Sequence, residues 1–501
     1  MSDGDALTVL FKDVLVYHPD GITGPVDVMV SGQRIAGIGS VPAGPADLVV
    51  EGRSHHLLVP GLLNAHFHSP ANHLKGSLPS MPLEMFMLYE SPADESLRPS
   101  PREAYLRTML AATEMLRNGT TSVQDDAFLM PSPEPDIIDA VMLAYRDCGI
   151  RATVALDQPE LAETDKLPFL DGRLDPALRQ PAPMGAKDLL ERYDYLFSKW
   201  HGAADGRLSA AVSISAPQRV SPEYFAALDE LSRTHQVPLY AHMLETKVQR
   251  VLSSEQARFA GRSLVRYSAD LGLLNERTNV IHAVWVDDLD LDLIAEAGAV
   301  VVHNPVSNLR LGSGIMPFRA ARRRGIPVAL GVDEAICNDR ADMWNVVRMA
   351  GLIHNITGPD DEWPSAGEVL ESLWSGGAAA MLRSHDLGRI QVGALADLAL
   401  LDLHSPAFTP LNDAFGQLVY CESGSSVVLT MVDGAVVARD GHLTAVDEAA
   451  LFDEAREVFS YRAAERDAAR RGADRLLPVY AEVVRRSAAI DVGLDRWARG
   501  R

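Results

Sequence analysis

The chain of 501 residues contains only three cysteines, Cys148, Cys337 and Cys421, which lie far apart in the sequence. An odd number at such spacing fits neither a disulfide framework nor a thiolate zinc site, and it suits a reducing cytoplasm. The first five residues include two aspartates and lack the basic and apolar segments of a secretion signal. We therefore expect a cytoplasmic protein.

Basic residues and long apolar runs are also scarce. Lys and Arg number 46 against 68 Asp and Glu, so the formal net charge is −22. Without a basic excess the chain cannot displace counterions from phosphate, which argues against nucleic acid as a partner. No apolar run reaches the ~18 residues that a membrane helix needs, so no membrane partner is expected. The 47% hydrophobic content is ordinary for a globular enzyme.

The middle of the chain alternates patterns typical of buried strands and of helices. The apolar runs end near His68, Asp126, Asp157, Ser215, His242, His282, His303 and Asp333. Eight such strands predict an α/β fold, a (β/α)₈ TIM barrel over residues 62–387. A doubly wound parallel sheet is the alternative, but its glycine-rich phosphate loop is absent after the first strand.

The two ends of the chain have a different texture. Residues 1–61 and 388–445 alternate short β-rich runs with turns, and Asp433-Gly434 predicts a hairpin. We expect one small β-sandwich built from both segments, with two unrelated sheets as the alternative. Residues 446–501 predict a helical tail, with helices over 451–471 and 476–489, that lies on the surface or in an oligomer contact.

Ligand-type side chains stand at the ends of several predicted strands. His66 and His68 are two apart on a strand, so both point to the same face. His242, His282 and Asp333 end later strands, and the strand ends of a TIM barrel converge on one face. A lone HxH pair or a single core histidine would be weak evidence, but the whole set predicts a catalytic metal site. Imidazole nitrogens and a carboxylate oxygen suit zinc.

Two further features refine this metal site. Glu245 follows His242 by three residues, where a carboxylate can overhang the water and shuttle protons without binding the ion. The predicted fourth strand, 208–215, ends without the Lys or Glu that would bridge two metals. We therefore expect one metal.

These motifs resemble those of the amidohydrolase superfamily. The order HxH, HxxE, H and D, opened by Pro60-Gly-Leu-Leu-Asn-Ala-His66, is similar to its single-metal branch. That branch contains cytosine deaminase-like, s-triazine and adenosylhomocysteine deaminase-like aminohydrolases. The segments 303–315 and 388–402 are also similar to segments of this family, and the resemblance covers residues 8–445.

The resemblance implies one divalent metal ion per chain, with zinc as the default and iron or manganese also compatible. The implied ligands are His66, His68, His242 and Asp333. The implied catalytic residues are Glu245, which would protonate a ring nitrogen, His282, which would orient the attacking hydroxide, and Asp333, which would take the proton from water. The substrate contacts that we expect are His303, Gln218, Glu334 and Asn308.

The implied activity is hydrolytic deamination of an amino-substituted nitrogen heterocycle, of s-triazine, pyrimidine, purine or pterin type, with release of ammonia. Open alternatives are a chlorohydrolase, an N-alkylaminohydrolase or a cyclic amidase, and a non-catalytic scaffold. Gln218 stands where the nucleoside-deaminating branch usually has histidine, which argues against a nucleoside. Glu334 favours a substrate with additional amino groups. We expect this small molecule as the partner, and a homo-oligomer, dimeric or larger.

Overall fold

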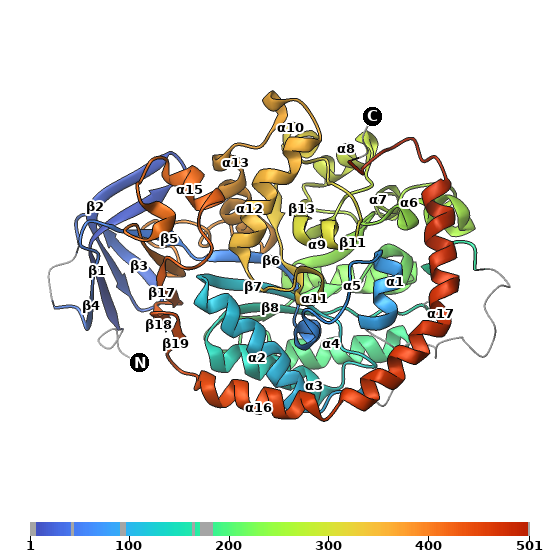
Figure 1. The fold of residues 1–501 in the computed structure, drawn as a ribbon, viewed down its shortest axis with the longest axis horizontal. Coiled ribbons are helices and arrows are strands. Elements are labelled where there is room, and N and C mark those ends of the chain that lie inside the picture. The colour runs from blue at the N-terminus through green and yellow to red at the C-terminus, as the bar shows by residue number, and fades with distance from the viewer. Residues whose placement is uncertain (1–6, 42–44, 91–96, 163–165, 171–183, 499–501) are drawn as a thin grey trace.

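The computed structural model describes residues 7–41, 45–90, 97–162, 166–170 and 184–498. Its centre is a ring of parallel strands, seen in the middle of Figure 1. Two five-stranded sheets have the orders β15-β6-β7-β8-β9 and β10-β11-β12-β13-β14. They join because β9 continues into β10 across Ala211, and β14 into β15 across Gly331 and Val332. The ring thus has eight strands, and the predicted barrel is confirmed.

The barrel strands are β6 (Leu62–His68), β7 (Thr120–Ala127), β8 (Arg151–Leu156), β9 (Leu208–Ala210), β10 (Val212–Ser213), β11 (Leu239–Met243), β12 (Thr278–His282), β13 (Val300–His303), β14 (Val328–Leu330) and β15 (Asp333–Glu334). The helices between and after them are α1 (Leu83–Glu90), α2 (Pro101–Arg117), α3 (Pro135–Cys148), α4 (Ala186–Trp200), α5 (Pro222–His235), α6 (Lys247–Glu255), α7 (Leu264–Asp270), α8 (Asp288–Ala297), α9 (Pro305–Arg310), α10 (Phe318–Arg323), α11 (Ala335–Asn338), α12 (Met343–Ile353), α13 (Ala366–Glu371) and α14 (Gly377–Ala380).

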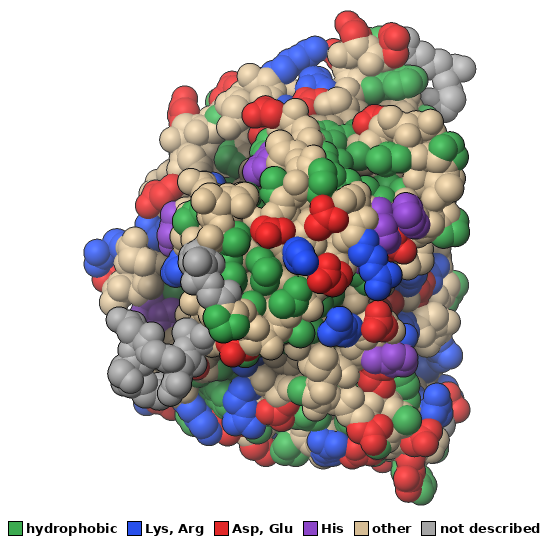
Figure 2. Space-filling view, turned by 90° about the vertical axis from the view of Figure 1, so that its left-hand side faces the viewer, with side chains coloured by type: hydrophobic (Ala, Val, Ile, Leu, Met, Phe, Trp, Pro, Cys, Tyr) green, Lys and Arg blue, Asp and Glu red, His purple; other side chains and the backbone are tan. Residues whose placement is uncertain are grey.

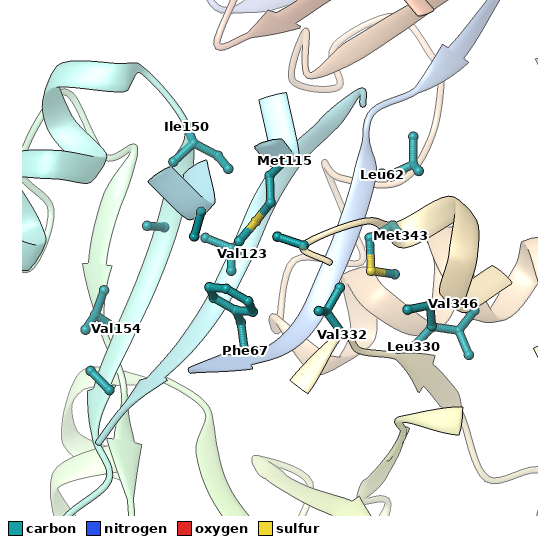
Figure 3. Close-up of a cluster of buried hydrophobic side chains, with 14 of the residues drawn as sticks. Leu62, Phe67, Met115, Val123, Ile150, Val154, Leu330, Val332, Met343 and Val346 are labelled. Carbon is teal, nitrogen blue, oxygen red and sulfur yellow. The ribbon is translucent and has the colours of Figure 1, made fainter. Parts of the chain in front are cut away.

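The core of the barrel domain lies between the strands and these helices. Every residue of β7 is buried, as expected for a parallel strand covered on both faces. Figure 3 shows Phe67 and Val123 on neighbouring strands with Met115 of α2 beside them. On the other side of β6, Val332 lies near Met343 of α12. This packing holds β6, which carries two predicted ligands, between α2 and α12.

The terminal segments meet in one nine-stranded sheet, on the left of Figure 1. Its strands are β1 (Thr8–His18), β2 (Gly21–Ser31), β3 (Arg34–Ile38), β4 (Leu48–Glu51), β5 (His56–Pro60), β16 (Leu398–Asp402), β17 (Val427–Val432), β18 (Ala435–Arg439) and β19 (His442–Leu443). The antiparallel pair β5–β16 joins the two ends of the chain. Because both segments pair in one sheet, the alternative of two unrelated sheets is wrong. Figure 2 looks onto this end of the molecule, where charged side chains of both signs are interspersed with apolar ones.

The C-terminal helices run along the outside of the barrel, past α2 and α1 (Figure 1). They are α16 (Glu448–Ser460) and α17 (Ala463–Ala489), and α15 (Ala414–Tyr420) precedes β17. The expected break near residues 472–475 is wrong, because α17 continues through Gly472 and Pro478. Leu476 and Tyr480 pack in an apolar cluster with Leu88 of α1, so tertiary burial outweighs the local helix-breaking signals. No helix in the described ranges is long and apolar enough to cross a membrane.

Candidate metal centre and active site

The predicted ligands meet at the C-terminal ends of the barrel strands. They come from β6 (His66 and His68), β11 (His242), β12 (His282) and β15 (Asp333). Closure of the ring by β15 and β6 places Asp333 opposite Phe67, the residue between the two β6 histidines. Asp333 and Phe67, which lie far apart in the sequence, thus become neighbours because the first and last barrel strands pair.

The donor atoms lie at distances that suit a single ion. The Nε2 atoms of His66 and His242 are 3.2 Å apart. Oδ1 of Asp333 lies 3.6 Å from Nε2 of His66 and 3.6 Å from Nε2 of His68. Donors at about 2.1 Å from a tetrahedral zinc lie about 3.4 Å from one another. Two overlapping groups, His66 with His68 and Asp333, and His66 with His242 and His282, could each hold a metal ion.

The outer nitrogens of two of these imidazoles are held by backbone carbonyls. Nδ1 of His68 lies 2.5 Å from the carbonyl oxygen of Asp126, and Nδ1 of His242 lies 2.7 Å from that of Ser215. A carbonyl oxygen only accepts, so each Nδ1 carries the proton and each Nε2 keeps a free lone pair. This arrangement directs both Nε2 atoms toward the metal centre, as metal-binding histidines require.

The protonation states of the site also suit metal binding. Burial lowers the pKa of His66 to about 3, and burial together with the other imidazoles lowers that of His242 well below its usual value. Burial acts against ionisation of Asp333, but the neighbouring His66, His282 and His68 lower its pKa well below the ordinary range. Neutral imidazoles and an ionised carboxylate are the forms that bind a cation.

His282 and Glu245 lie side by side next to Asp333. Nε2 of His282 is 3.6 Å from Oε2 of Glu245 and 3.7 Å from Oδ2 of Asp333. Nδ1 of His282 lies 2.9 Å from Oδ1 of Asn308 and donates to it. Burial, with Asp333 and Glu84 nearby, raises the pKa of Glu245 well above its usual value. The raised pKa favours the protonated form of Glu245, which can donate a proton beside the proposed metal centre.

Several of the strand ends have strained backbones. Ser215, Leu244, His282 and Asp333 have φ values of 57°, 55°, 73° and 66°, in the left-handed region that non-glycine residues avoid. Such residues cost free energy and persist where the surrounding structure enforces them, most often at functional sites. Four of them at the ends of four barrel strands mark this face as the functional one.

Gly331, between β14 and β15, passes unusually close to the β6 ligands. A Cβ atom at this position would lie 2.4 Å from Oδ1 of Asn304 and 2.8 Å from Cβ of His66. Neither neighbour can move freely, because both are buried. Only glycine therefore lets the last barrel strand approach His66.

The predicted substrate residues occupy two different places. Gln218 and Glu334 line the pocket above the metal centre. Asn308 holds His282, as described above, and does not line this pocket. His303 points elsewhere, since its Nε2 lies 3.2 Å from Nε2 of His354, which follows α12.

Several pocket residues were missed in the sequence. These residues are Phe128, Asp157, Arg219 and Gln249. Asp157 and Phe128 follow strands β8 and β7, so the same reasoning from strand ends could have identified them. Arg219 follows Gln218 directly.

Comparison with known proteins gives a consistent result. Residues 57–437 match the sequence profile of the Amidohydrolase family. A 5-methylthioadenosine/S-adenosylhomocysteine deaminase of Halobacterium salinarum is 33% identical over 456 residues, which cover 90% of this chain and 96% of that protein. A 5'-deoxyadenosine deaminase of Methanosarcina mazei is 29% identical and covers 90% and 97% of the two chains.

Solved structures agree with this match. A zinc-bound adenosine deaminase from Xanthomonas campestris superposes with a TM-score of 0.79 at 26% identity, over 93% of this chain and 99% of that one. A triazine hydrolase from Arthrobacter aurescens has a TM-score of 0.80 at 22% identity, over 90% and 99%, which indicates a shared fold. With most of its length matched by the family profile and its donor residues grouped at the strand ends, the chain belongs to the amidohydrolase family.

Proposed function

We propose that this protein is a metal-dependent hydrolytic deaminase that acts on an amino-substituted nitrogen heterocycle and releases ammonia. The observation that carries the proposal is the buried carboxyl group of Glu245, whose pKa is raised, beside the proposed donors His66, His68, His242 and Asp333. Such an acid is what a poor leaving group such as an amine needs at neutral pH.

The side chains divide the work between two proton transfers. When bound, a divalent ion lowers the pKa of water toward about 7 and so supplies a nucleophile at neutral pH. Asp333 would accept the proton that this water loses. Nε2 of His282, as a hydrogen-bond acceptor, would orient the water. Glu245 donates its proton to the ring nitrogen beside the amino-bearing carbon. Asp333 passes its proton to the amino group, the C–N bond breaks and ammonia leaves. The added hydroxyl returns a proton to Glu245 as its C=O bond forms.

Zinc is the metal that we propose, with one ion per chain. Three imidazoles and one carboxylate suit zinc, although iron and manganese accept the same donors. Asp157 lies 3.8 Å from Nδ1 of His68, but that nitrogen already donates to the carbonyl of Asp126. Nδ1 of His68 therefore has no lone pair left to bind a second ion.

Within the substrate class, the names of the relatives favour a purine: one acts on methylthioadenosine and adenosylhomocysteine, another on 5'-deoxyadenosine. The polar residues Gln218 and Glu334 line the pocket and are proposed as contacts to the heterocycle. Asn308 would then affect the substrate only by holding His282. His303, which contacts His354, would act only indirectly. A chlorohydrolase remains the second candidate, because a triazine hydrolase shares the fold.

The test is a panel of heterocyclic amines with zinc-loaded protein, assayed for ammonia. The panel contains adenosine, 5'-deoxyadenosine, adenine, cytosine, a pterin and melamine, with a chlorotriazine assayed for chloride. We expect ammonia from at least one amine and none with the Asp333→Asn variant. Release of chloride alone would favour the second candidate, and no release from any compound by protein with a full metal complement would refute a deaminase.

For the whole chain we propose three parts: residues 1–61 with 388–445 as a β-sandwich, 62–387 as the catalytic barrel and 446–501 as the helical tail. Support for the first part is its own apolar core, with Phe11 and Leu58 packed with Leu400 and Met431. We also propose a cytoplasmic homo-oligomer, consistent with three unpaired cysteines. Light scattering of the purified protein measures the oligomeric state.

A further inference from the structure

A second cavity, of about 190 Å³, lies beside the metal pocket. It has room for about six water molecules at their liquid volume. Its walls are the turn over Ser69–Leu74, helices α1 and α2, the loop after β7, and the C-terminal helices α16 and α17. Of the residues that line it, only Phe128 also lines the metal pocket. None of the predicted site residues faces this cavity.

Arginines dominate the charged part of its lining. They come from α2 and from the start of α17, and they are Arg107, Arg462, Arg466 and Arg470. Arg462 is neutralised by Glu103, since its Nε and Nη2 lie 2.9 Å from the two carboxylate oxygens. Arg470 donates from Nη2 to the carbonyl of Ser77 at 3.2 Å, which holds its position without cancelling its charge.

Arg107 and Arg466 are half-buried, and neither has an ion-pair partner in direct contact in the described part of the chain. The buried Nε of Arg107 has no hydrogen-bond partner there. Arg466 donates from Nη2 only to the carbonyl oxygen of Phe459, at 3.0 Å. Burial, with Arg462 and Arg466 nearby, lowers the pKa of Arg107 to about 10 against the opposing effect of Glu103 and Glu90, so it remains charged at neutral pH. Burying such a charge is costly unless a partner compensates it.

The acidic groups of the lining compensate these two arginines only in part. Glu103 forms an ion pair with Arg462, and Asp467 is exposed at the rim of the cavity. Burial, together with the charge of Asp157, raises the pKa of Glu90 to about 8, so this carboxyl group is largely protonated at neutral pH. The cavity therefore carries an excess of positive charge.

We propose that this cavity binds an organic anion, a carboxylate or phosphate monoester on an apolar body. Arginine presents a planar fork of donors that matches the oxygens of both anions. The remaining walls are apolar, formed among others by Leu74, Leu129 and Phe459, and suit the body of such a molecule. The anion supplies the counter-charge that Arg107 and Arg466 lack.

Titration calorimetry of the zinc-loaded protein tests this site. The probes are phenylacetate and phenyl phosphate, with phenylacetamide as the uncharged control. We expect saturable binding of at least one anion and none of the amide. Arg107→Met and Arg466→Met should each weaken this binding by about tenfold or more, because each removes charged hydrogen bonds. Arg471→Met, an exposed neighbour on α17 outside the cavity, should leave it unchanged.

Anions also bind metal ions, so a second comparison separates the two sites. Binding at the arginine cavity should persist in Asp333→Asn protein depleted of metal. Binding that is lost in this variant but unchanged in Arg107→Met would place the anion at the metal centre and overturn the proposal, as would the absence of saturable binding. Arg107→Lys, which keeps the charge, should retain part of the affinity and guards against misfolding of the Met variant.

Discussion

Glu245 and Asp333 are two buried carboxyl groups whose surroundings give them opposite protonation states. Asp333 is surrounded by imidazoles, which stabilise its negative charge. Glu245 faces Asp333 and Glu84 instead, and both disfavour a further negative charge. Pairs of titratable groups whose pKa values are driven apart serve as acid and base in one reaction. In the proposed reaction these two carboxyl groups would carry the two proton transfers of the hydrolysis.

The role of Glu245 can be measured by Glu245→Gln. We expect turnover to fall by about 10²–10⁴-fold, the range for loss of a proton-transferring group, with the metal content unchanged by elemental analysis. Glu255→Gln, at an exposed position on α6, is the matched control and should keep full turnover. A parallel loss of metal in Glu245→Gln would identify this residue as a ligand and contradict its role as an acid.

Among the elements, the join between β14 and β15 is the most constrained. Gly331 lies where any side chain would collide with Asn304 and with His66. Helix α17 shows the opposite situation, because a Cβ at Gly472 would meet nothing within 4 Å. Close approach of neighbouring atoms therefore requires a glycine at position 331, whereas no steric contact requires one at position 472.

This contrast predicts two substitutions with opposite effects on stability. Gly331→Ala should lower the free energy of unfolding by about 1–3 kcal/mol, because the added methyl group overpacks the core, and should reduce metal content by displacing His66. Gly472→Ala should raise it by about 0.5–1 kcal/mol, since alanine favours the helix. Denaturant unfolding and elemental analysis measure both. Equal stability of the two variants would mean that β15 can move away from β6.

For the whole molecule, a buried ion cluster links the barrel to the terminal sheet. Arg151 on β8 contacts Asp397, which precedes β16, with Nε 2.7 Å from Oδ2. It also contacts Asp433, in the turn between β17 and β18, with Nη2 2.7 Å from Oδ1. One guanidinium thus serves two carboxylates from a segment more than 240 residues away in sequence.

Arg151→Met should lower the free energy of unfolding by about 3–5 kcal/mol, because it leaves Asp397 and Asp433 as uncompensated charges in the interior. Urea unfolding followed by circular dichroism measures this loss. Arg146→Met removes a surface pair with Asp147 and should cost less than about 1 kcal/mol. If both variants lost equally little free energy of unfolding, the ion cluster would not hold the barrel and the terminal sheet together.

Removal of the metal should destabilise the whole chain. The four proposed donors from β6, β11 and β15 would share the ion, so its binding would favour the folded state by mass action. We expect a chelator to lower the Tm of the native protein. The Asp333→Asn variant should already melt at a lower temperature and respond less to the chelator. An unchanged Tm of the native protein after verified metal loss would argue that the centre forms without the ion.

Much of the barrel could be predicted from the sequence, because strand and helix periodicity are local properties of the chain. The apolar runs ending at His68, His242 and His282 are strands in the structure. Their ligand-type ends follow from the rule that barrel strands converge on one face. The helical tail was less predictable, since packing against α1, not its own glycine and proline, determines where α17 continues.

By itself, the sequence determined which residues could bind a metal and on which strands they lie, since residue type and periodicity are local. Only the tertiary structure decided which of them meet. Pairing of β15 with β6 brings Asp333 to the histidines, and contacts with His354 turn His303 away from the pocket. The arginine cavity likewise exists only where α17 passes α2. The physical reason is that contact distance depends on how elements pack, which no local pattern in the chain records.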